Sequence, residues 1–372
     1  MRVLIAPDKF KGTLTAVEVA RAMRAGVLRA FPNASVELRP VADGGDGTAE
    51  TIREALGGTR SLVVVSGPLG APVEAPLYLL DDGRVVIEMA QASGLALVEG
   101  DKDPLRASSF GTGELLGAAL EYVSEDGEVL IAIGGSASTD GGTGAARARG
   151  WRFLDAASRD LDPGGGALVD LAVIEPPVET QRATITGVSD VDNPLLGPSG
   201  AARVFGPQKG ASPAEVELLE RGLDVLAERI AQDLDIDVGS ISGGGAAGGM
   251  GAGLVAFFGG ELKPGFETLA AAVELAAALG RADLVLTGEG SLDEQSLAGK
   301  APIGVARMAA EAGVPCLAIS GRVALDASRL AEVGVSEAVD LVSEAGESRA
   351  FDEPAAALAD AVAVLLRRHA DK

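Results

Sequence analysis

The strongest constraint on the fold is an alternation of short apolar segments and amphipathic segments at both ends of the chain. Residues 2–7 (RVLIAP) have the pattern of a buried strand, and the next segment has helical spacing, with Thr15 and Glu18 forming a capping box at its start. A second strand pattern (SVELRPVA, 35–42) and a second helical pattern (GTAETIREALGG, 47–58) follow. The chain therefore opens with the order strand, helix, strand, helix.

The same alternation returns in the last part of the chain, where three strand patterns are separated by helical patterns and a helix closes the sequence. The strand patterns are ADLVLTG (282–288), VPCLAISG (314–321) and EAVDLVS (337–343). Strands that alternate with helices favour a parallel sheet covered on both faces. We expect a doubly wound parallel α/β sheet made from both chain ends. The expected domains are 1–58 plus 282–372, interrupted by 59–281.

The inserted segment has a different pattern. A hairpin signal, Asp82-Gly83, lies between two alternating apolar and polar stretches. Helical patterns follow at 110–123 and 212–231, with a strand pattern, VLIAIGG (129–135), between them. A chain of 372 residues exceeds one ordinary hydrophobic core. We therefore expect the insertion to form a second domain.

Charge and rare residues exclude several functions. The formal net charge of -23 argues against nucleic acid as a partner, because such binding needs a basic surface. The one cysteine, Cys316, lies in an apolar run and is expected to be a buried structural thiol that forms no disulfide. The one histidine, His369, is expected in a frayed tail, which excludes a histidine-based triad and argues against a zinc site.

No apolar run is long enough to cross a bilayer, and the first residues reach Pro7 and Asp8 too early for a signal peptide. We expect a cytoplasmic protein without a membrane partner. The sequence leaves open whether the chain forms a homo-oligomer.

Charged residues follow three of the predicted strands. The first strand is followed by Asp8, Lys9 and Lys11, the second by Asp43 and Asp46, and the third by Glu289 and Asp293. In an open parallel sheet, ligands bind outside the carboxyl ends of the strands. Turn formation explains any one of these clusters equally well. Three such clusters together favour a binding cleft.

A glycine-rich stretch, IGGSASTDGGTGAA (133–146), follows another strand pattern and leads into a helix. Its backbone N–H groups can bind an anion, its hydroxyl groups can add donors, and Asp140 can hold a metal or cap the helix. A second glycine run begins at Ser242 and has the same features, although tight helix packing on small residues explains it nearly as well. Three of the seven lysines, Lys11, Lys209 and Lys300, touch a glycine, as suits a phosphate binder.

Neither glycine run has the spacing of a P-loop or of a dinucleotide-binding fingerprint. Instead, several longer motifs together resemble the two-domain glycerate kinases of the bacterial type I family. These motifs are APDKFKGTLTA (6–16), ADGGDGT (42–48), SSFGTGELL (108–116), IGGSASTDGGTGAA (133–146), DVDNPLLGPSGAARVFGPQKGA (190–211), GGGAAGGMGAGL (243–254) and LTGEGSLDEQSLAGKAP (286–302). The resemblance covers nearly the whole chain.

The resemblance implies phosphorylation of D-glycerate by ATP and Mg²⁺ to 2-phosphoglycerate, and a Rossmann- or flavodoxin-like domain interrupted by a larger mixed α/β domain. A carboxylate would accept the substrate proton in a cleft between the domains. Asp190 is the leading candidate for this base and Asp43 the second, although an Asx-Pro turn also explains the segment from Asp190 to Gly197.

The other site residues are assigned by role. Lys11 is expected to take part in catalysis, and substrate binding is assigned to Asp8, Lys9, Ser136 and Arg322. Nucleotide binding is assigned to Gly134, Gly135, Gly141, Gly142, Gly248, Gly249, Lys209 and Lys300, and metal binding to Asp192, Glu289 and Asp293.

Two positions depart from the family pattern: Ser291 stands where arginine is common, and Ala298 where histidine is frequent. Two other functions stay open on the sequence. One is a different small-molecule enzyme, either a kinase of another hydroxy acid or a phosphatase, and the other is a metabolite sensor without catalysis.

Overall fold

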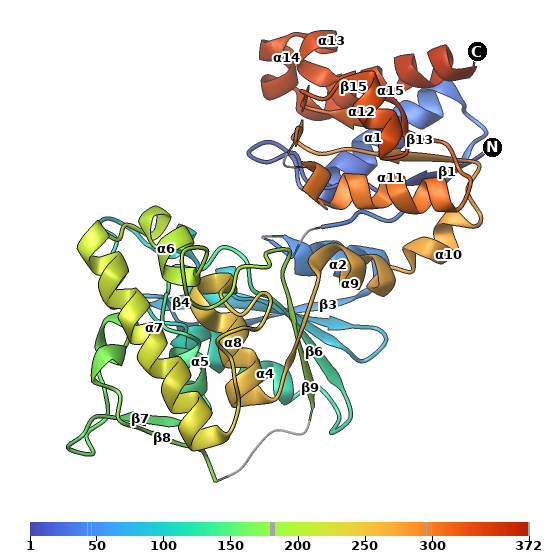
Figure 1. The fold of residues 1–372 in the computed structure, drawn as a ribbon. Coiled ribbons are helices and arrows are strands. Elements are labelled where there is room, and N and C mark those ends of the chain that lie inside the picture. The colour runs from blue at the N-terminus through green and yellow to red at the C-terminus, as the bar shows by residue number, and fades with distance from the viewer. Residues whose placement is uncertain (43, 46, 179–182, 295, 299, 371–372) are drawn as a thin grey trace. The chain divides into compact units, whose positions relative to one another are not determined.

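The computed structural model describes residues 1–42, 44–45, 47–178, 183–294, 296–298 and 300–370 (Figure 1). The chain forms two compact units. Unit 1 consists of Met1–Asp43, Glu50–Gly57 and Gly265–Lys372, and unit 2 consists of Gly44–Ala49 and Gly58–Pro264. The return to unit 1 therefore lies at Gly265, earlier than the expected residue 282. The short segment Gly44–Ala49 belongs to unit 2, which the sequence did not indicate.

Unit 1 contains a five-stranded parallel sheet with the order β15-β13-β11-β1-β2. Its strands are β1 (Arg2–Ile5), β2 (Ser35–Leu38), β11 (Leu284–Thr287), β13 (Cys316–Ser320) and β15 (Val335–Asp340). These are the five strands that the apolar patterns predict, and the parallel α/β sheet from both chain ends is confirmed. The chain leaves β1 toward β2 on one side, while β11 pairs on the other. The switch point of the topology therefore lies between β1 and β11.

Helices cover both faces of this sheet because successive side chains of a strand point to opposite faces. Val3 and Ile5 pack with α1 (Ala16–Ala30) and α15 (Pro354–Ala370), and Leu4 packs on the other face with the helices that follow residue 264. The predicted capping box of Thr15 and Glu18 begins α1. The other elements of unit 1 are α2 (Thr48–Leu56), α9 (Gly265–Ala272), α10 (Leu275–Leu279), β12 (Ser291–Leu292), η4 (Ser296–Ala298), α11 (Ala301–Glu311), β14 (Arg322–Val323), α12 (Ala327–Glu332), α13 (Leu341–Ala345) and α14 (Glu347–Asp352).

Unit 2 contains a six-stranded mixed sheet with the order β10-β9-β6-β5-β4-β3. Its strands are β3 (Gly58–Ser66), β4 (Pro72–Leu80), β5 (Val85–Glu88), β6 (Glu128–Ala132), β9 (Thr184–Val188) and β10 (Glu261–Lys263). Only β4 runs against the others, because it pairs antiparallel with both β3 and β5. The predicted hairpin at Asp82-Gly83 joins β4 to β5. The carboxyl ends of the other five strands therefore lie at one edge of the sheet.

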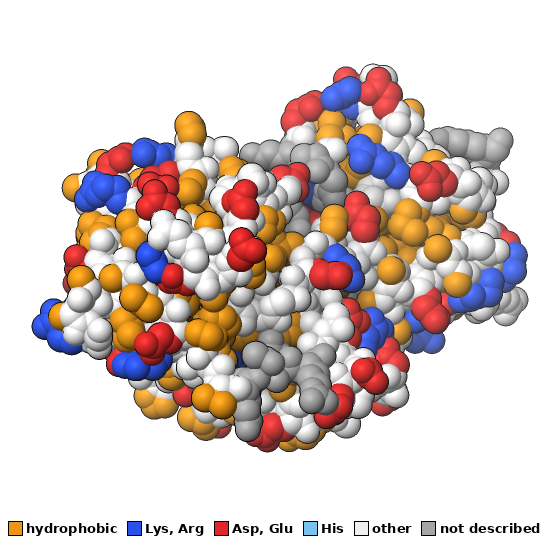
Figure 2. All heavy atoms as spheres, turned by 60° about the horizontal axis from the view of Figure 1, so that its bottom comes forward, with side chains coloured by type: hydrophobic (Ala, Val, Ile, Leu, Met, Phe, Trp, Pro, Cys, Tyr) orange, Lys and Arg blue, Asp and Glu red, His pale blue; other side chains and the backbone are white. Residues whose placement is uncertain are grey.

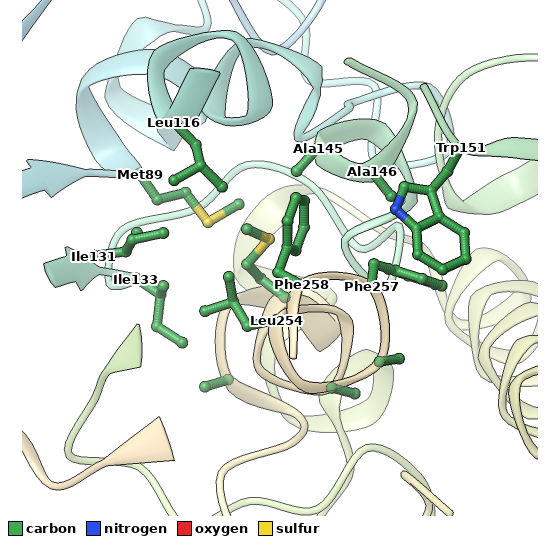
Figure 3. Packing of buried hydrophobic residues seen from close by; sticks show 14 of the residues in the cluster. Met89, Leu116, Ile131, Ile133, Ala145, Ala146, Trp151, Leu254, Phe257 and Phe258 are labelled. Atoms are coloured by element: carbon green, nitrogen blue, oxygen red, sulfur yellow. The ribbon is translucent and has the colours of Figure 1, made fainter. Parts of the chain in front are cut away.

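The core of unit 2 lies between this sheet and the helices that pack on it (Figure 3). The Phe257 ring packs 5.2 Å from Trp151 and 5.3 Å from Phe153, measured between ring centroids. The helix predicted at 212–231 runs from Pro213 to Leu234 and is capped by Ser212. The remaining elements are α3 (Ala90–Ser93), η1 (Leu95–Leu97), α4 (Phe110–Leu120), α5 (Thr143–Ala148), β7 (Arg152–Leu154), η2 (Gly165–Asp170), β8 (Val173–Glu175), α6 (Ala201–Phe205), η3 (Pro207–Lys209), α7 (Pro213–Leu234) and α8 (Ala246–Phe258).

Two rare residues have different outcomes. Cys316 is fully buried as expected, and burial raises the pKa of its thiol to about 12. The expected frayed tail at His369 is wrong, because α15 continues to Ala370 and His369 Nδ1 lies 2.9 Å from Glu337 Oε1. Among the described residues, no helix is both long and apolar enough to cross a membrane.

Candidate functional site

The loops after β1 and β11 bring several predicted site residues of unit 1 together. The backbone N–H of Asp8 donates to Gly288 O at 2.9 Å, which joins the two loops directly. The Asp8 side chain is buried, and its Oδ1 accepts from the Lys9 backbone at 2.6 Å. Lys11 is exposed in the following turn, whose backbone lies against Gly290. Asp8, Lys9 and Lys11 therefore lie beside the Gly288–Gly290 segment at the switch point.

Glu289 is the buried carboxylate of this group, with 7% of the residue exposed. Its Oε2 lies 3.6 Å from Lys300 Nζ. Its Oε1 is buried and has no hydrogen-bond partner within the described part of the chain. Burial raises the pKa of Glu289, while the hydroxyl of Ser296 and the ammonium group of Lys300 oppose this shift. A buried carboxylate oxygen without a partner is suited to bind a cation.

Asp293 holds the short turn that follows. Its Oδ1 accepts from the backbone N–H of Ser296 at 3.2 Å, and Ser291 Oγ lies 3.5 Å from its Oδ2. Ser291, at one position that departs from the family pattern, therefore supports this turn. The side chain of Ala298 lies outside the described part of the structure.

Arg322 is near this loop but its guanidinium is engaged at the surface. Its backbone N–H donates to Gly290 O at 3.1 Å, while Nη2 lies 3.0 Å from Glu347 Oε1. A substrate anion at Arg322 would compete with Glu347 for the guanidinium.

In unit 2, the glycine-rich turn joins β6 to α5, as the sequence predicts. Gly44 and Gly45 pack against the start of this turn, and a Cβ atom at Gly134 would lie 3.1 Å from Gly45 Cα. A Cβ atom at Gly44 would lie 3.1 Å from Val188 O, the end of β9. The described part of the ADGGDGT segment therefore lies at the carboxyl ends of β6 and β9. Asp43 and Asp46 lie outside the described residues.

Asp140 fixes the shape of the turn by accepting several hydrogen bonds. Its Oδ2 accepts from Ser109 N at 2.8 Å, from Ser109 Oγ at 2.9 Å and from Gly144 N at 3.2 Å. Its Oδ1 accepts from Gly142 N at 3.3 Å. Of the two roles considered for Asp140, the structure therefore favours capping and turn formation over metal binding.

Lys209 lies inside unit 2, with 2% of the residue exposed. Its Nζ donates to Ser136 Oγ at 2.9 Å and to the backbone oxygen of Ser138. Burial lowers the pKa of Lys209 to about 7, and the negative charge of Asp140 opposes that shift. In the described part of the chain, the buried hydroxyls of Ser138 and Thr139 lack hydrogen-bond partners. The lysine predicted to bind nucleotide thus holds the turn from within.

The second glycine run packs directly against the first. Ala247, Gly248 and Gly249 have φ values of 55°, 71° and 92°, so the regular part of α8 begins after them. A Cβ atom at Gly248 would lie 2.1 Å from Ser138 O, and one at Gly249 would lie 2.8 Å from Gly141 Cα. Close packing therefore accounts for these glycines at least in part.

Asp190 and Asp192 follow β9, and both are exposed. Because β9 pairs in parallel with β6, Asp190 lies at the same edge of the sheet as the glycine-rich turn. Asp192 Oδ1 accepts from Ser242 Oγ at 3.3 Å. Asp192 thus lies in unit 2, whereas Glu289 and Asp293 lie in unit 1. No group of three or more metal-binding side chains occurs among the residues that the structure describes.

Glu88 is a residue of this edge that the sequence analysis missed. It ends β5, is 3% exposed, and accepts hydrogen bonds from Gly47 N at 3.2 Å and Ala49 N at 2.7 Å. The available signal was a carboxylate, Glu88, directly after the apolar residues VVI of a predicted strand pattern. Glu88 thus holds the backbone at Gly47 and Ala49 against the end of β5.

Comparison with known proteins supports the family resemblance of the motifs in unit 1 and unit 2. Residues 3–370 match the family model of the glycerate kinase family. The glycerate kinase of Halalkalibacterium halodurans is 45% identical over 91% of this chain and 90% of its own. The glycerate 2-kinase of Escherichia coli is 42% identical over 93% and 92% of the two chains. The crystal structure of a putative glycerate kinase 2 from Salmonella typhimurium covers 100% of both chains with a TM-score of 0.87 and 40% identity. The chain therefore belongs to the glycerate kinase family of phosphotransferases.

Proposed function

We propose that this enzyme transfers the γ-phosphoryl group of ATP to the 2-hydroxyl of D-glycerate and releases ADP and 2-phosphoglycerate. Membership of the glycerate kinase family carries the proposal, and the relative named glycerate 2-kinase supports the 2-phospho product. The glycine-rich turn beside the exposed carboxylate of Asp190 suits phosphoryl transfer, which needs positioning, charge neutralisation and a proton acceptor.

In the proposed step, the 2-hydroxyl oxygen of glycerate forms a bond to the γ-phosphorus, and the bond to the bridging oxygen of ADP breaks. The hydroxyl proton passes to the carboxylate of Asp190, with Asp43 as the alternative acceptor. Lys9 and Lys11 bind the carboxylate of glycerate, and Asp8 fixes their loop through its bond to the Lys9 backbone. The backbone of the glycine-rich turn binds phosphate oxygens, and Lys209 holds this turn in shape.

Magnesium fits the donor set of Glu289. The buried Oε1 lacks a partner among the described residues, and Mg²⁺ is commonly held by one or two carboxylates together with substrate phosphates. When bound, the ion would neutralise charge on the phosphate oxygens. Glu289 is therefore the leading ligand, whereas Asp293 is already used in its own turn.

The first test is ADP release by the purified protein with D-glycerate, ATP and Mg²⁺, with each component omitted in turn and L-glycerate as a control. Phosphorus NMR of the product distinguishes 2-phosphoglycerate from 3-phosphoglycerate. Release that requires all three components supports the function. A folded protein that releases no ADP with D-glycerate but does so with another hydroxy acid would disprove the substrate.

The base is tested by Asp190→Asn, with Asp224→Asn as the matched control, because Asp224 is an exposed carboxylate of α7 in the same unit. Loss of a general base lowers kcat by about 10²- to 10⁴-fold. We expect this loss at Asp190 with little change in the affinity for ADP. If Asp190→Asn retains wild-type kcat and Asp43→Asn does not, the proton acceptor is Asp43.

A further inference from the structure

Unit 2 has a pocket of about 310 Å³ that none of the assigned site residues line. It is bounded by the turn after β3, by the start of α4, by Arg147 of α5 and by Pro163. Pockets that hold small molecules usually begin at about this volume. The pocket is therefore large enough for a ligand of the size of a nucleoside.

The pocket is positively charged although the chain as a whole is acidic. Arg106 and Arg147 line it, against the single carboxylate of Asp103. Arg147 Nη1 donates to the carbonyl oxygen of Leu161 at 2.8 Å. This carbonyl group is neutral, so the hydrogen bond does not cancel the positive charge of the guanidinium. In the described part of the chain, no carboxylate pairs with the guanidinium of Arg106, which is exposed. This charge favours an anionic ligand.

The other walls are flat and apolar. Phe110 is 36% exposed and Leu69 is 44% exposed, and both line the pocket together with Pro68 and Pro163. An exposed aromatic ring next to an arginine is suited to stack with a planar ring, because both groups bind the face of a base. The lining therefore combines a surface for a planar group with charges for an anion.

The pocket lies at the same edge of the sheet as the proposed phosphate site. Ser66, which lines the pocket, ends β3, and β3 runs in the same direction as β6. Three strand spacings separate β3 from β6, or about 14 Å, which is comparable with the length of an extended nucleoside triphosphate. Ser108 links the two places, because it lines the pocket and its Oγ lies 3.5 Å from Asp140 Oδ2.

We propose that this pocket binds the base and ribose of the nucleotide, with Phe110 stacking on the base and Arg106 binding the phosphate nearest the ribose. The inference rests on the proposed function, because it takes ATP as the second substrate. It adds a nucleotide subsite that neither glycine run contains. Arg147, which is held by carbonyl oxygens, adds positive potential to the pocket.

The test is calorimetric titration with ADP and, separately, with inorganic tripolyphosphate, for the wild type and for the variants Phe110→Ala and Arg106→Ala. Because a base stacks favourably on an aromatic ring, we expect Phe110→Ala to weaken ADP binding by about 5- to 150-fold. It should leave tripolyphosphate binding unchanged, whereas Arg106→Ala should weaken both ligands. Arg221→Ala, which removes an exposed arginine of α7 in the same unit, should change neither.

Phe110→Leu keeps an apolar side chain and protects the test against misfolding, and it should also weaken ADP binding while its thermal midpoint stays close to that of the wild type. ADP affinities within twofold of the wild type in all the pocket variants would overturn the inference. If this occurs while the wild type phosphorylates glycerate, the proposed function stands and only the subsite is wrong. A wild type that binds no ADP and has no turnover would disprove both.

Discussion

At the scale of single residues, Lys209 gives the clearest dependence on pH. Burial lowers its pKa to about 7 in the folded protein, from an ordinary lysine value of 10.5. Between these two values the unfolded chain binds a proton that the folded chain does not, so the free energy of unfolding rises with pH, by at most ~1.4 kcal/mol per pH unit. Below about pH 7 both states are protonated, so the free energy of unfolding no longer changes with pH through this group and the cost of burying the charged amine is fully present.

We predict that the difference in free energy of unfolding between the wild type and Lys209→Met becomes more favourable to the wild type from pH 7 to pH 10. Urea unfolding at several pH values measures this difference. Lys263→Met is the control, because the Lys263 side chain is 43% exposed, and its stability should run parallel to that of the wild type. Parallel curves for Lys209→Met as well would show that the buried amine is not the cause.

The proposed role of Glu289 as a magnesium ligand predicts how the reaction rate depends on Mg²⁺ concentration. Glu289→Gln keeps the size of the side chain but removes the charge that would bind the cation, so we expect the Mg²⁺ concentration for half-maximal rate to rise about tenfold or more. Glu294→Gln makes the same change at an exposed position that pairs with Arg329, and should leave this concentration unchanged. Equal Mg²⁺ dependence of both variants would remove Glu289 from the metal site.

The raised pKa of Glu289 adds a second expectation at the same residue. Its carboxylate is protonated at a higher pH than an ordinary glutamate, so Mg²⁺ binding should weaken earlier as the pH falls. The variant Glu289→Gln should lose this acid-side dependence.

At the scale of elements, the start of α8 is the place where two glycine runs meet. Gly248→Ala would bring a Cβ atom to 2.1 Å from Ser138 O at a φ of 71°, whereas Gly259→Ala, at the end of the same helix, would meet nothing within 4 Å at a φ of 60°. The left-handed backbone alone costs ~1–2 kcal/mol, and a collision with backbone adds to this.

We therefore expect Gly248→Ala to destabilise unit 2 by at least ~2 kcal/mol more than Gly259→Ala, and to reduce turnover as the glycine-rich turn shifts. Chemical denaturation compares the two variants. Equal losses of stability would show that the turn yields to α8 without cost.

The elements that the sequence predicts correctly depend on local signals. The capping boxes of α1 and α7 lie within four residues each, and the strands of unit 1 are short apolar runs. The assignment of Gly44–Ala49 to unit 2 could not be read in this way, because it rests on hydrogen bonds to Glu88, which is about 40 residues away in the chain. The boundary at Gly265 was missed because the apolar pattern of α9 and α10 does not tell which core they join.

The candidate site shows the same division. Sequence motifs indicate which segments carry chemistry, and strand order predicts that Asp8 and Glu289 lie near one another. Whether a side chain faces solvent depends on tertiary packing, and the burial of Lys209 beneath the glycine-rich turn follows from the way η3 packs on it. The pocket at Phe110 depends on four segments that are separate in sequence and has no local signal.

At the scale of the whole molecule, the excess of acidic residues predicts an effect of salt. The chain has 54 acidic and 31 basic residues, and the face drawn in Figure 2 shows acidic side chains scattered among basic and apolar ones. Screening weakens their mutual repulsion, whereas it also weakens surface ion pairs, which are worth only ~0–1 kcal/mol each. Repulsion should dominate at this net charge.

We expect the thermal midpoint to rise by a few degrees between about 10 mM and 300 mM sodium chloride, a range over which the Debye length falls severalfold. Potassium chloride at equal ionic strength should give the same shift, since the cause is screening. A midpoint that falls with salt would mean that the surface ion pairs outweigh the repulsion.

The discontinuous sheet of unit 1 has a consequence for folding during synthesis on the ribosome. β1 lies between β2 and β11 in that sheet, but β11 begins only at Leu284. At a synthesis rate of ~5–20 residues per second, β1 and β2 are made tens of seconds before the strand that completes their pairing. Unit 2 is almost wholly synthesised in that interval. The inserted unit can therefore fold first, while the apolar N-terminal strands still lack their pairing partner β11. We expect chaperones that act on nascent chains to bind this protein within its first forty residues, where these apolar strands are unpaired.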